Sequence, residues 1–141
     1  MKEIAGDIWD RHDAGFWIVV TTNGVIKRDG SCVMGRGIAR QAKKRFPRLP
    51  FELGAKIEAC GNVVFSFPRY RIYTLPTKHN WWERADLDLI VSGCRQLVES
   101  APASQVVYLV RPGCGNGSLS WDDVRPTIAP ILDDRFVVIN R

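Results

Sequence analysis

The stretch VVYLVRPGCGNG, residues 106–117, joins a continuous apolar run to a glycine-rich turn. An uninterrupted apolar run of this length is typical of a strand that is buried on both faces of a parallel sheet. The glycines at alternate positions, Gly113, Gly115 and Gly117, permit backbone conformations with positive φ, in which successive N–H groups form a concave anion site. The stretch therefore predicts a central strand that ends in an anion-binding loop.

A second pair of glycines, Gly35 and Gly37, follows another apolar run at residues 16–22. The stretch VMGRGIA at 33–39 is predicted to open a helix that runs to about Phe46, where Pro47 and Pro50 stop it. Unpaired N–H groups and the helix dipole favour an anion at such a helix start. Because ligands of open α/β sheets bind beyond the carboxyl ends of the strands, the two loops are expected at one edge and favour a diphosphate ligand.

The other segments alternate between strand and helix patterns. We expect strands at 2–9, 62–67, 71–75 and 135–139, and helices at 51–59 and 86–100. Ser120 begins a capping box, and a single turn followed by a second helix from Pro126 accommodates the proline. His12 is expected in a loop after the first strand. The alternation predicts one domain spanning residues 1–141, a three-layer α/β/α sandwich with a mixed, largely parallel central sheet.

Composition narrows the function classes. The chain has 141 residues, 45% of them hydrophobic, and a formal net charge of +5, which suggests an anionic partner. No segment resembles a signal peptide or a membrane span, so a cytoplasmic protein with no membrane partner is expected, most simply a monomer. Four cysteines without a C-x-x-C pair, together with two histidines, predict reduced thiols and no metal site. The sequence also lacks a P-loop and the full G-x-G-x-x-G spacing.

Five motifs together resemble the macrodomain family: GDI at 6–8, TNG at 22–24, VMGRGIA at 33–39, LPTK at 75–78 and RPGCGNG at 111–117. They occur in order over nearly the whole chain, and their set is more specific than any one motif. The pattern looks similar to two branches of the family. One reverses ADP-ribosylation of DNA as an antitoxin, and the other removes terminal ADP-ribose from carboxylate side chains. The resemblance implies the macrodomain fold, ADP-ribose as the ligand, and no cofactor.

The resemblance also implies roles for individual residues. Asp7 would accept a hydrogen bond from the adenine amino group, with the Ile8 backbone beside it, and Asn23 would hold and orient the distal ribose. The residues implied to surround the diphosphate and the distal ribose are Thr22, Gly35, Arg36, Gly37, Ile38, Ala39, Gly113, Cys114, Gly115, Asn116 and Gly117. Arg36 would stabilise anionic charge or face solvent. The aromatic residue that often stacks on adenine in the family is not evident before the last residue, Arg141.

Lys78 matches the lysine that both branches use in catalysis. A lysine with a lowered pKa can act as a base or as a nucleophile at the anomeric carbon. The carboxylate-specific branch carries an acidic residue at the position of Gly117, so the DNA-directed branch is the nearer comparison. Trp81 and Trp82 follow Lys78 and either stack an unpaired base or serve as core or rim packing.

The leading hypothesis is an ADP-ribosyl hydrolase that acts on a modified nucleic acid such as DNA or on modified protein. One alternative is a phosphatase for ADP-ribose 1″-phosphate in which Arg36 holds the extra phosphate, and another is a non-catalytic reader of ADP-ribose. A nucleic-acid-binding domain with incidental glycine loops ranks last. That ranking rests on the expectation that the basic residues at 36–48 gather on one helix and do not line the cleft.

Overall fold

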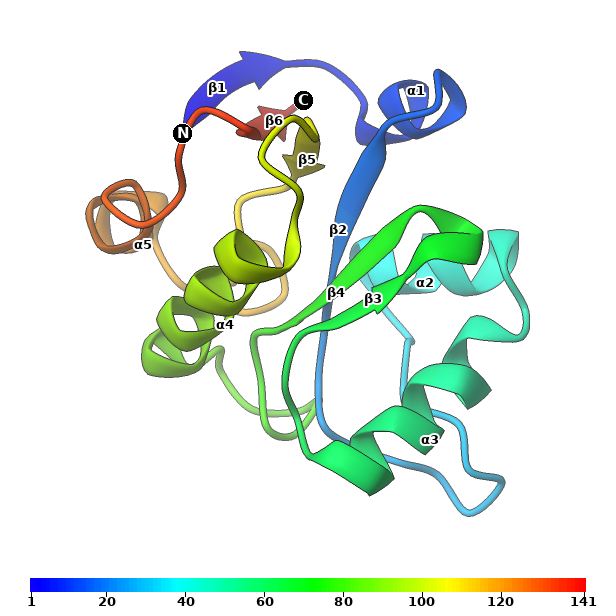
Figure 1. Ribbon diagram of the computed structural model, residues 1–141. Helices are drawn as coiled ribbons and strands as arrows, with labels where there is room; N and C mark the ends of the chain where they lie inside the picture. Colours follow the sequence, from blue (N-terminus) through cyan, green and yellow to red (C-terminus); the bar gives the residue numbers. More distant parts are fainter.

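The computed structural model describes residues 1–141 and contains one six-stranded sheet in the order β1-β6-β5-β2-β4-β3 (Figure 1). The strands are β1 (Lys2–Ala5), β2 (Trp17–Thr22), β3 (Phe65–Phe67), β4 (Ile72–Pro76), β5 (Val107–Leu109) and β6 (Phe136–Asn140). Every neighbouring pair is parallel except β3 and β4, which are antiparallel. The prediction of a mixed, largely parallel sheet is confirmed.

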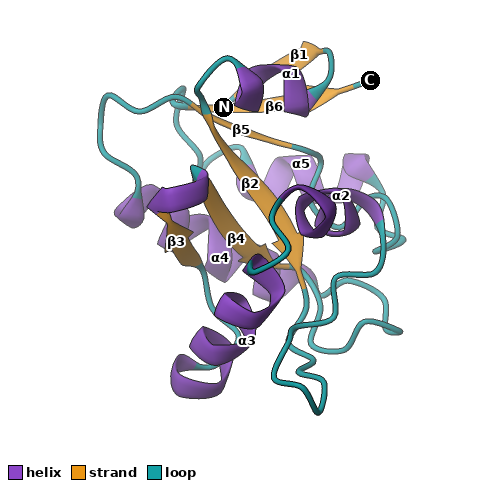
Figure 2. Ribbon diagram, turned by 90° about the vertical axis from the view of Figure 1, so that its right-hand side faces the viewer, coloured by secondary structure: helices purple, strands orange, loops and turns teal.

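Helices cover both faces of this sheet. They are α1 (Ile8–Asp13), α2 (Gly37–Arg45), α3 (Leu49–Cys60), α4 (Leu87–Ser100) and α5 (Trp121–Ile128), with a short 3-10 turn η1 (Pro68–Tyr70). One hydrophobic cluster lies between the sheet and α1, α2 and α3, and a second lies between the sheet and α4 and α5. Figure 2 shows α2 and α3 in front of the strands and α4 and α5 behind them. The three-layer α/β/α architecture is therefore confirmed.

The central strands β2 and β5 are packed on both faces, which explains why apolar and polar residues do not alternate in their sequences. In β2, Ile18 and Val20 belong to the cluster under α1–α3, while Val19 belongs to the cluster under α4 and α5. In β5, Tyr108 faces the first cluster and Leu109 the second. Because side chains alternate between the faces of a strand and both faces are covered, the middle of β2 and all of β5 are buried.

The first strand is shorter than predicted. It ends at Ala5, and Asp7 adopts an extended conformation as the N-cap of α1, its Oδ1 accepting a bond from the Trp9 backbone N–H at 3.0 Å. The expectation that His12 lies in a loop was also wrong. His12 is a buried residue of α1, and its Nε2 lies 2.7 Å from the Tyr70 carbonyl oxygen. Aspartate is among the preferred N-cap residues, and this preference overrides the strand pattern around Ile8 and Trp9.

Two proline predictions also need correction. Pro50 does not end α2 but occupies the first turn of α3, where its missing N–H costs nothing. Pro126 lies inside a single helix, α5, and does not start a second one. The carbonyl deprived of its partner belongs to Asp122, and both residues are exposed, so the missing hydrogen bond lies at the solvent-facing side of the helix, where its loss costs little. Gly61 ends α3 with φ 87°, as its C-cap role predicts.

None of the helices has the length and apolar character that a membrane crossing requires. All four cysteines are free. Burial raises the pKa of the Cys32 thiol to about 11 and that of the Cys94 thiol to about 12, so both are protonated at neutral pH. No three His, Cys, Asp or Glu side chains come together in a way that would hold a metal ion.

Candidate active site

A cavity of about 570 Å³ opens at the carboxyl ends of the parallel strands. Its lining comes from the ends of the strands, the segments that follow them, and the first glycine loop with α2. The lining residues are Gly6, Asp7 and Ile8 after β1; Thr21, Thr22 and Asn23 at the end of β2; Thr77, Lys78 and Trp81 after β4; Val110, Arg111, Gly113, Gly115, Asn116 and Gly117 after β5; Ile139, Asn140 and Arg141 at the end of β6; and Val33, Gly35, Arg36, Gly37, Ile38, Ala39 and Gln41. The carboxyl end of every parallel strand, or the residues directly after it, thus contributes to the cavity, which is the edge predicted from the sequence.

The structure brings together nearly all of the residues that the sequence singled out. Asp7, Ile8, Thr22, Asn23, Gly35, Arg36, Gly37, Ile38, Ala39, Lys78, Gly113, Gly115, Asn116 and Gly117 line the cavity. Cys114 does not. Its half-buried side chain packs against the cluster under α4 and α5, where burial raises the pKa of its thiol.

The first glycine loop leaves the start of α2 without a cap. Arg36, the N-cap residue, makes no side-chain bond to the first turn, whereas aspartate or serine side chains cap α1, α4 and α5. The N–H groups of Gly37, Ile38 and Ala39 have no protein acceptor at this cavity wall. Together with the helix dipole they form a positively polarised surface suited to an anion.

The second glycine loop folds back on itself so tightly that two of its glycines have no room for a side chain. A Cβ on Gly113, where φ is +76°, would lie 2.7 Å from Cδ1 of Ile90. A Cβ on Gly117 would lie 2.5 Å from the Gly113 carbonyl oxygen and 2.8 Å from the Ala85 Cβ. The loop is closed by a bond from the Ala85 N–H to the Gly117 carbonyl oxygen at 2.9 Å. The close packing of the loop therefore requires glycine at position 117.

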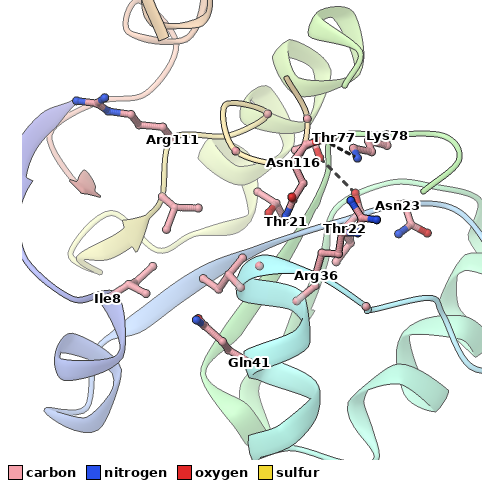
Figure 3. A pocket seen from close by; sticks show the side chains of 18 of the residues that line it. Ile8, Thr21, Thr22, Asn23, Arg36, Gln41, Thr77, Lys78, Arg111 and Asn116 are labelled. Carbon is pink, nitrogen blue, oxygen red and sulfur yellow. Dashed lines mark hydrogen bonds between the residues drawn. The ribbon is translucent and has the colours of Figure 1, made fainter. Parts of the chain in front are cut away.

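Lys78 connects the loop after β4 to the second glycine loop. Its Nζ donates to the Asn116 carbonyl oxygen at 3.0 Å and to the Trp81 carbonyl oxygen at 3.2 Å. Figure 3 shows the Arg36 side chain directed toward Lys78 and Asn116, with Ile8 at the opposite end of the cavity. Partial burial, and secondarily the positive charge of Arg36, lower the pKa of the Lys78 amine.

Asn23 has a structural role that the sequence did not indicate. Its Nδ2 donates to the Val33 carbonyl oxygen at 2.9 Å, and its Oδ1 accepts a bond from the Val25 N–H at 3.0 Å. These bonds tie the end of β2 to the segment that leads into Gly35. Asn23 thus holds the first glycine loop in place while it lines the cavity.

At the other end of the cavity, Asp7 has two partners. Its Oδ1 caps α1, and its Oδ2 pairs with the guanidinium of Arg141. These two hydrogen bonds, the first from the Trp9 N–H and the second from Arg141, lower the pKa of the Asp7 carboxyl. Arg141 reaches Asp7 because β6 runs parallel to β1, with Asn140 opposite Ala5.

Sequence reasoning missed Gln41 and Arg141 as lining residues. Gln41 accepts a bond from the indole Nε1 of Trp9 at 2.7 Å and lies one turn after Gly37, on the same side of α2. That helical spacing was a usable signal. No signal in the sequence placed Arg141 beside Asp7, because their proximity depends on the strand order.

Of the basic residues at 36–48, only Arg36 lines the cavity, and the others (Arg40, Lys43, Lys44, Arg45 and Arg48) lie outside it, as expected. The basic lining residues are Arg36, Lys78, Arg111 and Arg141, and Asp7 is the one lining acid. The Arg111 guanidinium lies 5.2 Å from the centre of the Trp121 ring and, in Figure 3, leads away from Lys78. The lining therefore carries more basic than acidic side chains, which favours an anionic ligand.

Replacing Asp7 with alanine is expected to lower the free energy of unfolding by about 1 kcal/mol, because the N-cap of α1 is lost. Asp7→Asn retains an oxygen that can cap the helix and should therefore keep most of the stability while removing the charge. Urea denaturation of the two variants measures this difference. Equal destabilisation by both substitutions would show that the Arg141 ion pair, and not the cap, is the stabilising interaction.

The chain is similar in sequence to proteins of known function. No model of a known protein family matches the chain. The DNA ADP-ribosyl glycohydrolase of Thermus aquaticus is 32% identical over 116 residues, covering 72% of this chain and 31% of the relative. The enzyme of the same name from Mycobacterium tuberculosis is 32% identical over 107 residues, a match that covers 65% of this chain and 29% of the relative. The match thus spans under a third of the length of these curated relatives.

Solved structures share the fold over the whole chain. The macrodomain of Thermus aquaticus DarG has a TM-score of 0.75 at 25% identity and covers 99% of this chain and 97% of that one. The macrodomain of Mycobacterium tuberculosis DarG has a TM-score of 0.77 at 25% identity, and the match covers 99% of this chain and 95% of that one. Thermosipho africanus DarTG in complex with ADP-ribose has a TM-score of 0.79 at 19% identity and covers 100% of this chain and 42% of that chain.

The three-layer fold, the two glycine loops at the carboxyl edge and these similarities define the class of protein: the chain belongs to the macrodomain family. Within that family it is similar to the macrodomains of DarG, the DNA ADP-ribosyl glycohydrolases.

Proposed function

We propose that this macrodomain binds ADP-ribose in the cavity and hydrolyses the bond that joins ADP-ribose to a base of a nucleic acid. The observation that carries the proposal is the position of Lys78, an amine of lowered pKa held at one end of the cavity between the two glycine loops. The names of the DarG relatives support the same reaction class.

The cavity suits a dinucleotide-like anion in size and charge. Its volume of about 570 Å³ lies in the range of small-molecule sites. The uncapped first turn of α2 lies on one side and the loop from Gly113 to Gly117 on another, so a diphosphate between them meets backbone N–H groups from both. Arg36 adds a positive charge at the Lys78 end.

The two ends of the cavity differ, which orients the ligand. Asp7 is the only lining acid, and its carboxylate suits the amino group of adenine once the Arg141 ion pair has been exchanged for it. The distal ribose then lies near Asn23 and Lys78 at the opposite end, as the family resemblance implies. In this orientation the anomeric carbon of the distal ribose is adjacent to the Lys78 amine.

A neutral Lys78 amine fits this position chemically. Its two N–H bonds are donated to the carbonyl oxygens of Trp81 and Asn116, which leaves the lone pair for the substrate. The amine then acts as a base or as the nucleophile at the anomeric carbon. In the net reaction the glycosidic bond breaks, the hydroxyl of a water ends on the anomeric carbon, and the proton goes to the leaving base.

The packing of the second glycine loop favours a nucleic-acid linkage over a carboxylate linkage. The carboxylate-specific branch of the family uses an acidic residue at the position of Gly117. Here a side chain at 117 would overlap the Gly113 carbonyl oxygen and Ala85. The acid is therefore excluded by the loop itself, which supports the DNA-directed reaction.

The test has two steps. Calorimetric titration with ADP-ribose should show binding, and release of ADP-ribose should then be measured from an ADP-ribosylated single-stranded oligonucleotide and from proteins ADP-ribosylated on carboxylates. We expect turnover of the oligonucleotide. Binding without turnover of either substrate would make the chain a reader, and phosphate release from ADP-ribose 1″-phosphate alone would make it a phosphatase. No binding would refute the proposal altogether.

The pH dependence of the reaction provides a separate prediction. The positive charge of Arg36 disfavours protonation of Lys78, so Arg36→Gln raises the pKa of the amine. Because the neutral amine is the reactive form, the rising limb of kcat against pH should move to higher pH, and kcat below that limb should fall several-fold. Arg36→Lys keeps the charge and should leave the limb in place. An unshifted limb in Arg36→Gln would mean that Lys78 does not react as a neutral amine.

A further inference from the structure

A second hollow of about 480 Å³ adjoins the cavity at Lys78. It shares part of its lining with the cavity, including Lys78 and Trp81, and it adds Trp82 and Arg84. We call this hollow the tryptophan groove. Since the two hollows share Lys78, any group that extends past the Lys78 end of the cavity enters the tryptophan groove.

The two tryptophans of the groove are exposed. The Trp82 residue is 64% exposed and Trp81 is 45% exposed, so packing into the core is not their role. Their ring centroids lie 5.5 Å apart with an interplanar angle of 89°, so the two rings do not stack face to face on each other. Exposed indole faces are an unfavourable surface in water unless a flat partner covers them.

The turn that bears the tryptophans is held by hydrogen bonds at both ends. The carbonyl oxygen of Trp81 accepts a bond from Nζ of Lys78, and the Asp86 N–H donates to the Thr77 carbonyl oxygen at 2.8 Å. The ring Nε2 of His79 lies 2.8 Å from Oδ2 of Asp86. A ligand that stacks on this turn therefore meets a preorganised surface, which reduces the entropy lost on binding.

The charges of the groove favour a polyanion. Its basic residues are Arg36, Lys78 and Arg84, and its one acid is Glu83, which already accepts a hydrogen bond from Asn80. Exposed aromatic faces beside basic side chains are the combination by which proteins bind single-stranded nucleic acid, since unpaired bases stack and phosphates are neutralised. In a duplex the base faces are already stacked on one another and do not reach such a surface.

We propose that the tryptophan groove binds the single-stranded nucleic acid that flanks the modified nucleotide, with an unpaired base stacked on Trp82 and a backbone phosphate at Arg84. This inference rests on the proposed function, because an anomeric carbon at Lys78 places the attached base at the entrance of the groove. The groove thus makes an ADP-ribosylated single strand a better substrate than an ADP-ribosylated nucleoside.

The test compares two substrates with the same bond to be cleaved: an ADP-ribosylated single-stranded oligonucleotide and the corresponding ADP-ribosylated nucleoside. Trp82→Ala should lower kcat/KM for the oligonucleotide by about tenfold or more, mainly through KM, and leave the nucleoside unchanged. Trp82→Phe should restore most of the loss.

Arg84→Gln should reduce the slope of log affinity against log salt for an unmodified oligonucleotide by about 0.7. Phe51→Ala, at an aromatic residue 50% exposed on α3, is the matched control and should change nothing.

The outcomes separate this inference from the proposed function. Equal kcat/KM for both substrates, with no effect of Trp82→Ala, would overturn the role of the groove while leaving ADP-ribose hydrolysis intact. Absence of ADP-ribose binding in the titration would instead refute the proposed function. Quenching of tryptophan fluorescence by an unmodified single strand, lost in Trp82→Ala, supports the groove independently of activity.

Discussion

Replacing Lys78 with alanine is expected to lower the rate of ADP-ribose release from a modified oligonucleotide by at least about 100-fold, the usual contribution of a positioned base. Affinity for free ADP-ribose should change little, because the diphosphate contacts come from the α2 start and the second glycine loop. The measurement is single-turnover release of ADP-ribose, paired with calorimetric titration of the same variant.

Two further substitutions at this position distinguish the roles that a lysine can have. Lys78→Arg keeps a positive charge and N–H donors, but a guanidinium cannot become neutral, so this variant should be nearly as inactive as the alanine variant. Lys78→Met tests whether the aliphatic stem alone supports the loops, and it should fold and bind ADP-ribose. An active Lys78→Arg variant would show that Lys78 contributes only charge and would remove it as base or nucleophile.

Introducing glutamate at Gly35 is expected to weaken ADP-ribose binding by at least about 100-fold, because a negative side chain is then placed beside the site for the diphosphate. No atom lies within 4 Å of a Cβ built on Gly35, and its φ is not in the left-handed region. The substitution should therefore leave the fold unstrained, and the new side chain has only the cavity or solvent to occupy. Calorimetric titration measures the loss.

Gly35→Ala is the matched control for this prediction. It adds only a methyl group in open space and should keep ADP-ribose affinity within a few-fold and the unfolding midpoint unchanged. If Gly35→Glu bound ADP-ribose as tightly as the original chain, the diphosphate would have to lie elsewhere in the cavity. If Gly35→Glu unfolded at lower denaturant than Gly35→Ala, loss of binding would be a consequence of loss of folding and the assignment of the α2 start would fail.

The fold was predictable because its local signals agree with one another. The apolar runs that became β2 and β5 are buried on both faces, and the glycines after each of them mark the edge where the cavity forms. The amphipathic spacing of 86–100 predicted α4 almost to the residue. The errors fell where two local signals compete, as at Asp7, where capping overrides a strand pattern, and at Pro126, where an exposed carbonyl tolerates the missing donor.

The candidate site likewise has features that the sequence predicts and contacts that only the folded structure shows. Glycines after buried strands, a helix start and a lysine after a strand are properties of short segments, and the sequence displays them directly. The backbone conformation is less direct, since only Gly113 of the three alternate glycines in the second loop has a positive φ. The pairing of Asp7 with Arg141, the bond from Lys78 to the Asn116 carbonyl and the tryptophan groove beside it join residues far apart in the chain. No local pattern encodes these contacts.

The sequence by itself therefore determined most of the element types, α1 excepted, together with the two glycine loops and the lysine that follows β4. Backbone propensity, side-chain alternation and glycine conformation act within a few residues. The tertiary structure alone decided which of these meet. The strand order β1-β6-β5-β2-β4-β3 brings the chain ends together at Asp7 and sets the residues after β4 and β5 on either side of β2. Such proximity follows from the joint packing of both hydrophobic clusters, and that packing is a property of the whole chain.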